Sequence, residues 1–345
     1  MPMSPSRPLV DELEPRRLCA TLTSGDTYPT LINGVGVQRN WSINLTAGQS
    51  ILVAAGETTS GPLQTELILI APNGKAIARS VGEKGSFIGK TAPVTGTYRV
   101  RVRDVGRNDT GGVKVTAFFT GGTVADSDDG TPIESGRRKA PTISPGDLDV
   151  WTIPATNGQF ISTVATENDV GSAVGVGVVL VGPDGKGITS KESDKGVDID
   201  LPAAKTGTYY AVVYEPGADA TGLYGISFAR TPGAQYGGDP DTQTALSSGV
   251  ARNGDLPGGD TDVFLVNVPA NRSVRVSLAG TTGSLDPELV IIDPLGNVVT
   301  KANAAFGATA VVNFTSNSSG GTYSILGRDR EADDGGRFTL TYTLT

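Results

Sequence analysis

The sequence predicts an all-β protein built from three tandem antiparallel β-sandwich domains with a jelly-roll-like arrangement of strands. Three observations support this prediction. The 345 residues include 47 Gly and 21 Pro but only 2 Met, a composition typical of turn-rich β proteins. A set of landmarks recurs along the chain at a nearly constant interval. Within each repeat, apolar and polar residues alternate with a period of two rather than 3.6.

Three turns of the form Pro-x-Gly define the length of the repeat. They lie at residues 72–74, 183–185 and 294–296. Both steps between them are 111 residues long. A strand that begins Thr-Gly-Thr-Tyr, or Gly-Gly-Thr-Tyr in the third copy, follows each turn and contains Tyr98, Tyr209 or Tyr323. Landmarks at fixed spacing are the signature of a repeated structural unit.

Two aromatic landmarks complete the repeat. An aromatic residue opens one strand of each copy, at Trp41, Trp151 and Phe264. A second aromatic residue marks the strand that closes each copy, at Phe118, Phe228 and Tyr342. The four landmarks keep the same order throughout. They predict a tail over residues 1–22 and domains over residues 23–121, 122–232 and 233–345.

The hydrophobic pattern distinguishes two kinds of strand. Segments such as 150–153 alternate apolar and polar residues, which indicates strands with one buried face. The segments before the Pro-x-Gly turns, 67–70, 178–181 and 289–292, are continuously apolar, which predicts burial on both faces. Pro presets the turn backbone and Gly relieves the steric clash at its end, so each apolar strand is expected to end in a tight hairpin.

Charge and composition exclude several classes of function. The chain has no His, which removes Ser-His-Asp, Cys-His and His-zinc chemistry. Its formal charge of −8 and pI near 4.7 argue against a nucleic-acid partner. Cys19 is the only cysteine, so no intrachain disulfide forms, and it is interpreted as an incidental residue of the tail. A carboxylate-pair hydrolase or a Ser-Lys dyad remains open, although no distinctive insertion offers a cleft for either.

The N-terminal tail carries its own signal. No run of 18 apolar residues predicts a transmembrane helix, and residues 1–22 lack the apolar core of a signal peptide. The stretch 13–18, LEPRRL, resembles the LEPR-XLL motif found near the N-terminus of large bacterial surface and secreted proteins, with Cys19 where the motif usually has a second leucine. The resemblance implies export or sorting; a short disordered arm is the alternative.

The order of landmarks over residues 31–345 resembles the bacterial pre-peptidase C-terminal domain, in three copies. The second and third copies contain the family's Gly-Asp-x-Asp-x-aromatic motif at 146–151 and 259–264, whereas the first copy reads Gly-Val-Gln-Arg-Asn-Trp at 36–41. Family members are β-sandwich accessories of secreted hydrolases and surface proteins. The resemblance therefore implies a non-catalytic protein located outside the cell or at its surface.

The same resemblance suggests calcium, because the similarly folded collagen-binding domains of bacterial collagenases bind this ion. Acidic residues gather before the second and third copies, each group followed by an Asp-x-Asp pair. The candidate metal ligands are Asp126, Asp128, Asp129, Asp147 and Asp149 for the second copy, and Asp239, Asp241, Asp260 and Asp262 for the third. Calcium prefers such oxygen ligands. No EF-hand-like loop is present, so solvated acidic turns are the favoured alternative.

Two functions of different classes fit this sequence. The first is a structural or adhesive protein of the cell envelope, with extracellular protein or polysaccharide as its partner. The second is a polysaccharide- or protein-binding accessory module. It would use aromatic residues as stacking platforms, for which the candidates are Tyr28, Tyr214, Tyr224 and Tyr236. The repeats consume about half of the aromatic residues as core, which favours the structural function.

Overall fold

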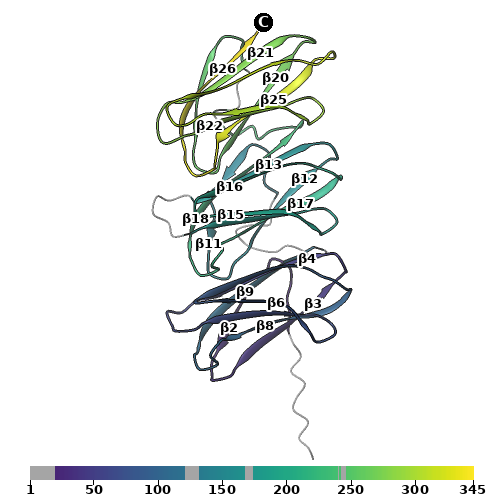
Figure 1. The fold of residues 1–345 in the computed structure, drawn as a ribbon, viewed down its shortest axis with the longest axis vertical. Helices are drawn as coiled ribbons and strands as arrows, with labels where there is room; N and C mark the ends of the chain where they lie inside the picture. Colours follow the sequence, from purple (N-terminus) through teal and green to yellow (C-terminus); the bar gives the residue numbers. More distant parts are fainter. Residues whose placement is uncertain (1–19, 121–131, 168–173, 240, 242–245) are drawn as a thin grey trace, which may run out of the picture.

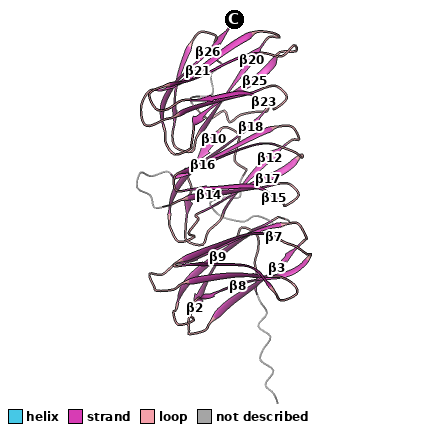
Figure 2. Ribbon diagram, in the orientation of Figure 1, coloured by secondary structure: helices cyan, strands magenta, loops and turns pink. Residues whose placement is uncertain are grey.

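The computed structural model describes residues 20–120, 132–167, 174–239, 241 and 246–345. These residues form strands, turns and loops without a helix (Figure 2), and none of them forms a membrane-spanning helix. The strands pair in six sheets, and every pairing is antiparallel except that of β1 (Ala20–Thr21) with β3 (Gln38–Leu45). The predicted all-β sandwich class is confirmed.

Three units of similar construction follow one another along the chain (Figure 1). The first contains β1, β2 (Thr27–Ile32), β3, β4 (Ser50–Glu57), β5 (Thr65–Ile70), β6 (Ala76–Gly82), β7 (Gly85–Thr91), β8 (Gly96–Asp104) and β9 (Gly111–Phe119). The second contains β10 (Arg137–Lys139), β11 (Thr142–Ile143), β12 (Asp149–Ala155), β13 (Phe160–Glu167), β14 (Val176–Val181), β15 (Gly187–Ser193), β16 (Gly196–Pro202), β17 (Gly207–Tyr214) and β18 (Gly222–Thr231). The third contains β19 (Ala251–Leu256), β20 (Thr261–Val268), β21 (Ser273–Gly280), β22 (Pro287–Ile292), β23 (Val298–Asn303), β24 (Thr309–Thr315), β25 (Gly321–Asp329) and β26 (Gly336–Leu344).

Each unit has a front sheet and a back sheet. The front sheets, which contain the Pro-x-Gly strands, have the orders β3-β8-β5-β6, β12-β17-β14-β15 and β20-β25-β22-β23. The back sheets have the orders β2-β9-β4-β7, β10-β18-β13-β16 and β19-β26-β21-β24. The strand order is the same in all three units and is that of a jelly roll, in which consecutive strands cross between two facing sheets. A separate hydrophobic core lies between the two sheets of each unit.

Contacts between the landmarks explain why they occur together. The glycine of each Gly-Thr-Tyr segment lies against the proline of the turn, so that a Cβ on Gly96 would come within 2.7 Å of Pro72. Gly207 and Gly321 approach Pro183 and Pro294 in the same way. Each tyrosine is buried, and the hydroxyl of Tyr98 donates a 2.6 Å hydrogen bond to the carbonyl of Val94 in the preceding loop. The landmarks are therefore parts of one packed corner.

The units stack so that each back sheet packs against the front sheet of the next unit (Figure 1). At the first junction, Leu52 and Phe118 pack against the second unit in an apolar cluster that includes Val150, Val181 and Val212. Phe160 and Ala229 form the second junction with an apolar group from the third unit: Val263, Val290, Ile292 and Leu326. This arrangement explains why β14 and β22 are apolar on both faces, since one face lines their own core and the other faces the preceding unit.

The closing strands of the first and second units place their aromatic residues on opposite faces of the back sheet. Val53 of β4 pairs with Ala117 of β9, and the equivalent Thr163 pairs with Phe228. Ala117 thus occupies the position of Phe228 in the core, while Phe118 faces the second unit. A shift of one residue along a strand reverses the face on which a side chain lies. The aromatic pattern alone could not reveal this shift.

The start of the described chain is packed. Ala20–Thr21 pairs with β3, and Leu22 is buried in the first core, although the sequence analysis assigns these residues to the tail. The apolar side chain of Leu22 therefore belongs to the core of the first unit. Residues 1–19, including the LEPR-XLL-like stretch and Cys19, lie outside the described residues. The domain boundaries stay predictions.

Candidate metal centre at the junction of the second and third units

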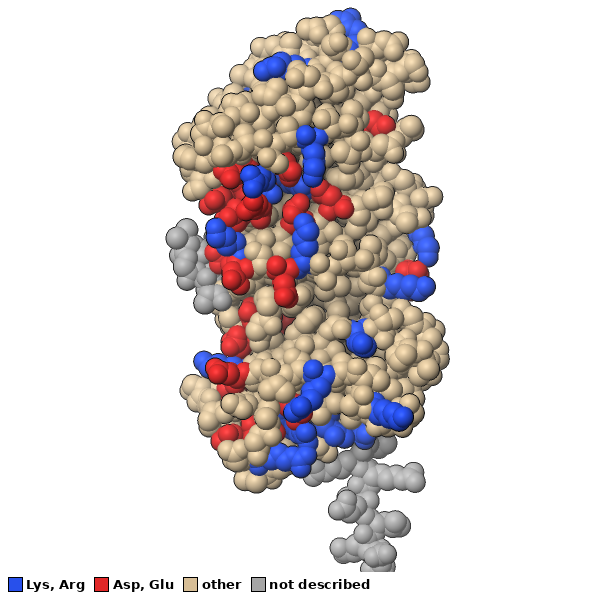
Figure 3. Space-filling view, viewed as in Figure 1, with Lys and Arg blue, Asp and Glu red and all other residues tan. Residues whose placement is uncertain are grey.

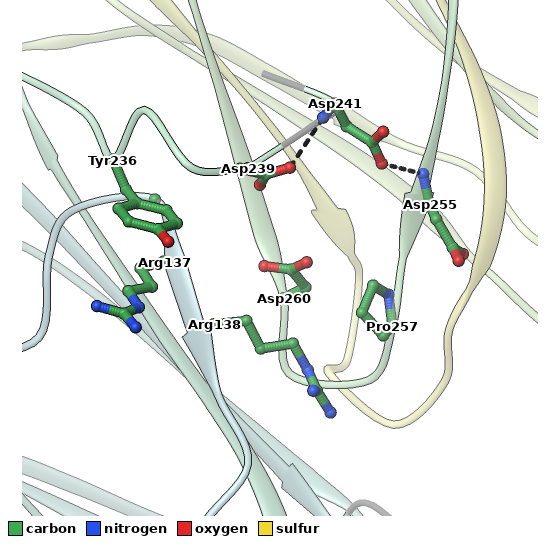
Figure 4. A pocket seen from close by; sticks show the side chains of 9 residues that line it. Arg137, Arg138, Tyr236, Asp239, Asp241, Asp255, Pro257 and Asp260 are labelled. Carbon is green, nitrogen blue, oxygen red and sulfur yellow. Dashed lines mark hydrogen bonds between the residues drawn. The ribbon is translucent and has the colours of Figure 1, made fainter. Parts of the chain in front are cut away.

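Four of the predicted metal ligands meet where the third unit begins. Asp239, Asp260 and Asp262 each place a carboxylate oxygen within 4.8 Å of the others. Asp241 and Asp260 also line a pocket of about 450 Å³, with Arg138 of the second unit on the opposite wall (Figure 4). We call Asp239, Asp260 and Asp262 the acidic trio.

The turn that presents Asp260 is pressed against the preceding unit. The amide of Asp260 donates to the carbonyl of Pro257 at 3.0 Å. Gly259 has a φ of +75°, and a Cβ on it would come within 2.7 Å of the Gly225 backbone. Arg138 donates from Nε to the carbonyl of Gly258 at 2.7 Å, across the same junction. Glycine is required in the Gly-Asp-x-Asp motif because both its backbone conformation and its close contact exclude a side chain.

Asp239 and Asp241 come from the segment between β18 and β19. The amide of Asp241 donates to Oδ1 of Asp239 at 2.9 Å, and the amide of Asp255 donates to Oδ2 of Asp241 at 2.6 Å (Figure 4). Asp241 therefore anchors its segment to β19, while Asp239 is directed toward the two aspartates of the motif. Local hydrogen bonds explain how this segment is brought to β20.

Asp262 is the least satisfied carboxylate of the trio. Its side chain is 0% exposed, and neither Oδ1 nor Oδ2 has a hydrogen-bond partner among the described residues. Asp260 is 8% exposed and accepts one bond, from the amide of Thr261 at 2.8 Å. Burial of an ionised carboxylate without a partner is costly, so such groups are neutralised, paired or bound to metal.

The electrostatics of the trio follow from this crowding. Burial, together with the negative charge of Asp239, raises the pKa of Asp260 to about 7. Burial raises the pKa of Asp262 well above its usual range, and the charges of Asp260 and Asp239 raise it further. Arg138 acts in the opposite direction on Asp260, but burial lowers the pKa of that guanidinium. Negative charge is thus in excess at the site.

The donor set of the trio suits a hard divalent cation. Calcium is bound by six to eight oxygen ligands, mostly carboxylates and carbonyls, in a flexible geometry. Asp239, Asp260 and Asp262 would hold such an ion through carboxylate oxygens, and Asp262 would gain partners for both of its oxygens. A bound ion would also remove the repulsion that raises the carboxyl pKa values. The carboxylate oxygens of the trio and the unpaired oxygens of Asp262 are therefore both compatible with a bound calcium ion.

The second unit satisfies its equivalent aspartates differently. Asp147 accepts hydroxyl donors from Thr27 at 3.2 Å and from Ser144 at 3.0 Å. Asp149 accepts a 2.6 Å bond from the hydroxyl of Tyr224, which itself accepts a bond from Trp151 Nε1 at 2.9 Å. Hydroxyl donors compensate a buried carboxylate without any ion. The remaining candidates, Asp126, Asp128 and Asp129, lie outside the described residues.

In the first unit Arg39 stands at the position of Asp149 and Asp262. It donates to the carbonyl of Leu31 at 2.8 Å and to Asn33 at 3.1 Å. Val37 occupies the other acidic position, and Gly36 faces open space. This unit therefore has no counterpart of the acidic trio among the described residues.

Sequence reasoning missed two features of these sites. Arg138, which faces the trio from the second unit, carries no recognisable motif. Tyr224 was expected to be exposed, but it is fully buried, and Tyr214 is 5% exposed, so the prediction that they act as stacking platforms is wrong. The repeat contained a signal for Tyr224. The equivalent residue of the third unit is Phe338, which has no hydroxyl, so the two units differ in a possible hydrogen-bond donor at this position.

The fold and the acidic motif define a chain of tandem jelly-roll units with a junctional carboxylate site. A family model described as the bacterial pre-peptidase C-terminal domain matches residues 260–326, within the third unit, and the repeated β-sandwich units are consistent with domains of this kind. Domains of this family occur in exported bacterial proteins and are generally non-catalytic modules. No curated protein matches the chain.

Solved structures give broader similarities. A periplasmic inhibitor of g-type lysozyme, PliG from Aeromonas hydrophila, is 16% identical over 28% of this chain and 96% of its own, with a TM-score of 0.23. The triple jelly roll from the turret assembly of an archaeal virus is 9% identical over 94% of this chain and 89% of its own, with a TM-score of 0.20. The strand order, rather than these similarities, identifies the units as jelly rolls.

Proposed function

We propose that this protein is a non-catalytic, exported or cell-surface structural protein of adhesive type, whose third unit is fixed to the second by a calcium ion. The observation that carries the proposal is the acidic trio, in which buried Asp262 has no donor for either oxygen. The family match in the third unit supports a place outside the cell. The ion would be structural, since it would tie the segment before β19 to the start of β20 in the third unit.

The stacked sheets support a structural role. Both junctions bury apolar side chains from the two units they join, so the units form one continuous rod rather than domains on flexible linkers (Figure 1). Large apolar contact between units restricts their relative motion. A rod of this kind is suited to holding a binding face at a fixed distance from an attachment point.

The acidic trio does not have the form of a hydrolase site. Glycosidase carboxylates flank an open cleft and lie about 5–5.5 or 6.5–9.5 Å apart. The carboxylates of the trio lie within 4.8 Å of one another, and two of them are buried. The chain also contains no His to act as a base. The trio is therefore better suited to hold a cation than to cleave a glycosidic bond.

Thermal and chemical unfolding of the full chain in calcium or in EDTA tests the metal site. We expect calcium to stabilise the protein by about 2.7 kcal/mol at a concentration one hundred times its Kd. Asp262→Asn should abolish this response, because it removes the charge from the most deeply buried member of the trio. Asp149→Asn, at the equivalent position of the second unit, is the matched control and should keep it. An unchanged wild-type melting curve would contradict the proposed ion.

Location is tested separately by cell fractionation. We expect the protein in the extracellular or cell-envelope fraction. A cytosolic pool as the sole pool would overturn the exported function whatever the outcome of the calcium experiment.

A further inference from the structure

Among the described residues, no unit is stacked on the front sheet of the first unit, unlike the front sheets of the second and third units (Figure 1). Its central strand β8 places three arginines on the outer face: Arg99, Arg101 and Arg103. The alternate residues Tyr98, Val100 and Val102 are buried in the core. Residues two apart on a strand are about 7 Å apart, so the arginines form a regular row.

The corresponding positions in the other units contact the preceding unit. In β17 they are Tyr210, Val212 and Tyr214, which pack on the first unit. In β25 they are Ser324, Leu326 and Arg328, of which Leu326 packs on the second unit. Only the first unit carries three cations along this row. The face that elsewhere forms a junction is here positively charged.

The neighbouring strands β5 and β6 add one more arginine to this face and a glutamate that holds two of the arginines in ion pairs. Glu66 of β5 is buried and forms ion pairs with both Arg103 and Arg79 of β6. Arg79 stays 59% exposed and Arg103 18% exposed. Arg101 donates to Asn40 at 3.2 Å, and Arg99 is exposed. Burial lowers the pKa of Arg101, and the nearby charges of Arg99 and Arg103 lower it further.

The second junction shows what this position of the fold binds. Arg328 occupies the position of Arg103, and Glu288 occupies that of Glu66. Arg328 donates to Glu288 at 2.7 Å within its own unit. It also reaches across the junction to both carboxylate oxygens of Asp200, each at 2.8 Å. The arginine–glutamate pair therefore receives carboxylates from outside the unit, and planar guanidinium groups favour such bidentate pairing.

We propose that the front sheet of the first unit binds a linear polysaccharide that carries carboxylate groups. Residues 20–120 contain ten Lys and Arg against six Asp and Glu, in a chain whose formal charge is −8. Basic side chains gather over the first unit, and acidic ones over the second and its junction with the third (Figure 3). A polyanion would therefore be attracted to this end of the rod and repelled by the rest.

The composition of the face distinguishes this ligand from other polyanions. The aromatic residues of the four main strands of this sheet are Trp41 and Tyr98, and both are buried in the core. Single-stranded nucleic acids and neutral sugars are bound through exposed aromatic rings, which this face does not offer. A protein sheet docked here would have to desolvate the row of arginines, whereas a hydrated acidic polysaccharide would not.

The proposal rests on the adhesive function proposed above, because it names the surface and the ligand that adhesion would use. The test measures binding of purified full-length protein to polygalacturonate by titration calorimetry, in EDTA so that calcium does not bridge the two. Binding should be saturable at low ionic strength and weaken as salt rises. Amylose, a neutral polymer, should not bind.

The arginine row is tested by Arg99→Ser with Arg101→Ser and Arg103→Ser. We expect at least a tenfold loss of affinity. The matched control Lys90→Ser with Arg275→Ser and Lys301→Ser removes the same charge from exposed positions elsewhere and should change affinity by less than twofold. Replacing the three arginines by lysine preserves the charge but not the bidentate geometry, and should give an intermediate affinity in a folded protein.

Absence of saturable binding to polygalacturonate would overturn the proposal, as would equal binding by the serine variant. Tighter binding of polyglutamate or single-stranded DNA would show that the face selects another class of polyanion and would overturn it too. A protein found at the cell surface that fails these binding tests loses only this proposal. A protein found solely in the cytosol loses the proposed function even if polygalacturonate binds.

Discussion

The two junctions of the rod share one geometry but use different chemistry. At the first, Phe87 stacks on Tyr214 with ring centroids 4.0 Å apart and planes 4° from parallel. At the second, the same two positions hold Asp198 and Arg328, which form an ion pair at 3.3 Å. The stacked sheets thus accept either an aromatic pair or a charged pair at one site. Position in the fold does not determine the type of contact.

The second aspartates of the two Asp-x-Asp pairs show the same divergence. Asp149 accepts a hydrogen bond from Tyr224, whereas the equivalent residue of the third unit is Phe338, which has no hydroxyl to donate. The charges of Asp260 and Asp239 act on Asp262 instead. One hydroxyl thus separates a motif aspartate that has a side-chain donor within its own unit from one that has none among the described residues.

The largest effect is expected from Arg328→Ala at the second junction. Arg328 is 0% exposed and pairs with Glu288, Asp198 and Asp200. Removing it takes away the cation that Glu288 and Asp200 share and leaves Asp198 with Lys191, and breaking a buried ion pair in this way costs about 3–5 kcal/mol. Chemical denaturation of the full chain measures the loss.

A double variant that places the aromatic pair of the first junction at the second junction provides a further test. Arg328→Tyr combined with Asp198→Phe rebuilds the pair found at Tyr214 and Phe87, and should recover part of the stability lost in Arg328→Ala. A loss below about 1 kcal/mol for Arg328→Ala, the range of exposed ion pairs, would mean that the network is solvated and that the two junctions differ little in energy.

The second prediction concerns pH. The pKa of Asp260 is about 7 in the folded protein against 3.8 for an ordinary aspartate, so the folded state holds the extra proton between these values. The free energy of unfolding of the metal-free protein should therefore fall as pH rises from about 4 to 7, by about 4 kcal/mol at most from this group. Calcium competes with the proton, so a saturating concentration should flatten the curve.

A control for the pH measurement lies in the same unit. Burial raises the pKa of Asp329 to about 6, and this group also lowers stability as pH rises. It accepts backbone bonds from Asp286 at 2.9 Å and Asp333 at 3.1 Å, outside the acidic trio. Its contribution should remain in calcium. A pH curve identical in calcium and EDTA would count against the metal site.

The sequence predicted the fold well because its landmarks are packing constraints. Pro72 and Gly96 contact each other, so their spacing carries the repeat. The side chains at the junctions were harder to predict. Arg328 and Asp200 are 128 residues apart, and nothing local marks them as partners. For the candidate site, the sequence predicted Asp239, Asp260 and Asp262 as candidate metal ligands, and the structure places them together, but only the structure shows that Asp149 already has a donor in Tyr224.

The third prediction concerns a residue of the second unit that is replaced by the residue type found at the equivalent position of the third unit. Tyr224→Phe places at this position the residue found at Phe338, and removes the hydroxyl from between Asp149 and Trp151. Loss of a buried hydrogen-bond partner costs about 1–3 kcal/mol. The reverse change, Phe338→Tyr, should stabilise the metal-free protein and reduce its response to calcium. Equal stability of Tyr224→Phe and wild type would mean that water replaces the hydroxyl.

The smallest effect is expected from Phe87→Leu at the first junction. Leucine keeps most of the apolar contact with the second unit but loses the stacking on Tyr214, which for an aromatic pair contributes about 1 kcal/mol beyond burial. A double-mutant cycle with Tyr214→Leu isolates this term, because both single changes remove the same stack. The first junction has no buried charge at this position, so its coupling energy should not vary between 50 mM and 500 mM salt, whereas the coupling of Arg328 with partly exposed partners such as Asp198 should weaken. A salt-dependent coupling between Phe87 and Tyr214 would show that the first junction also depends on charge, and the distinction between the two junctions would fail.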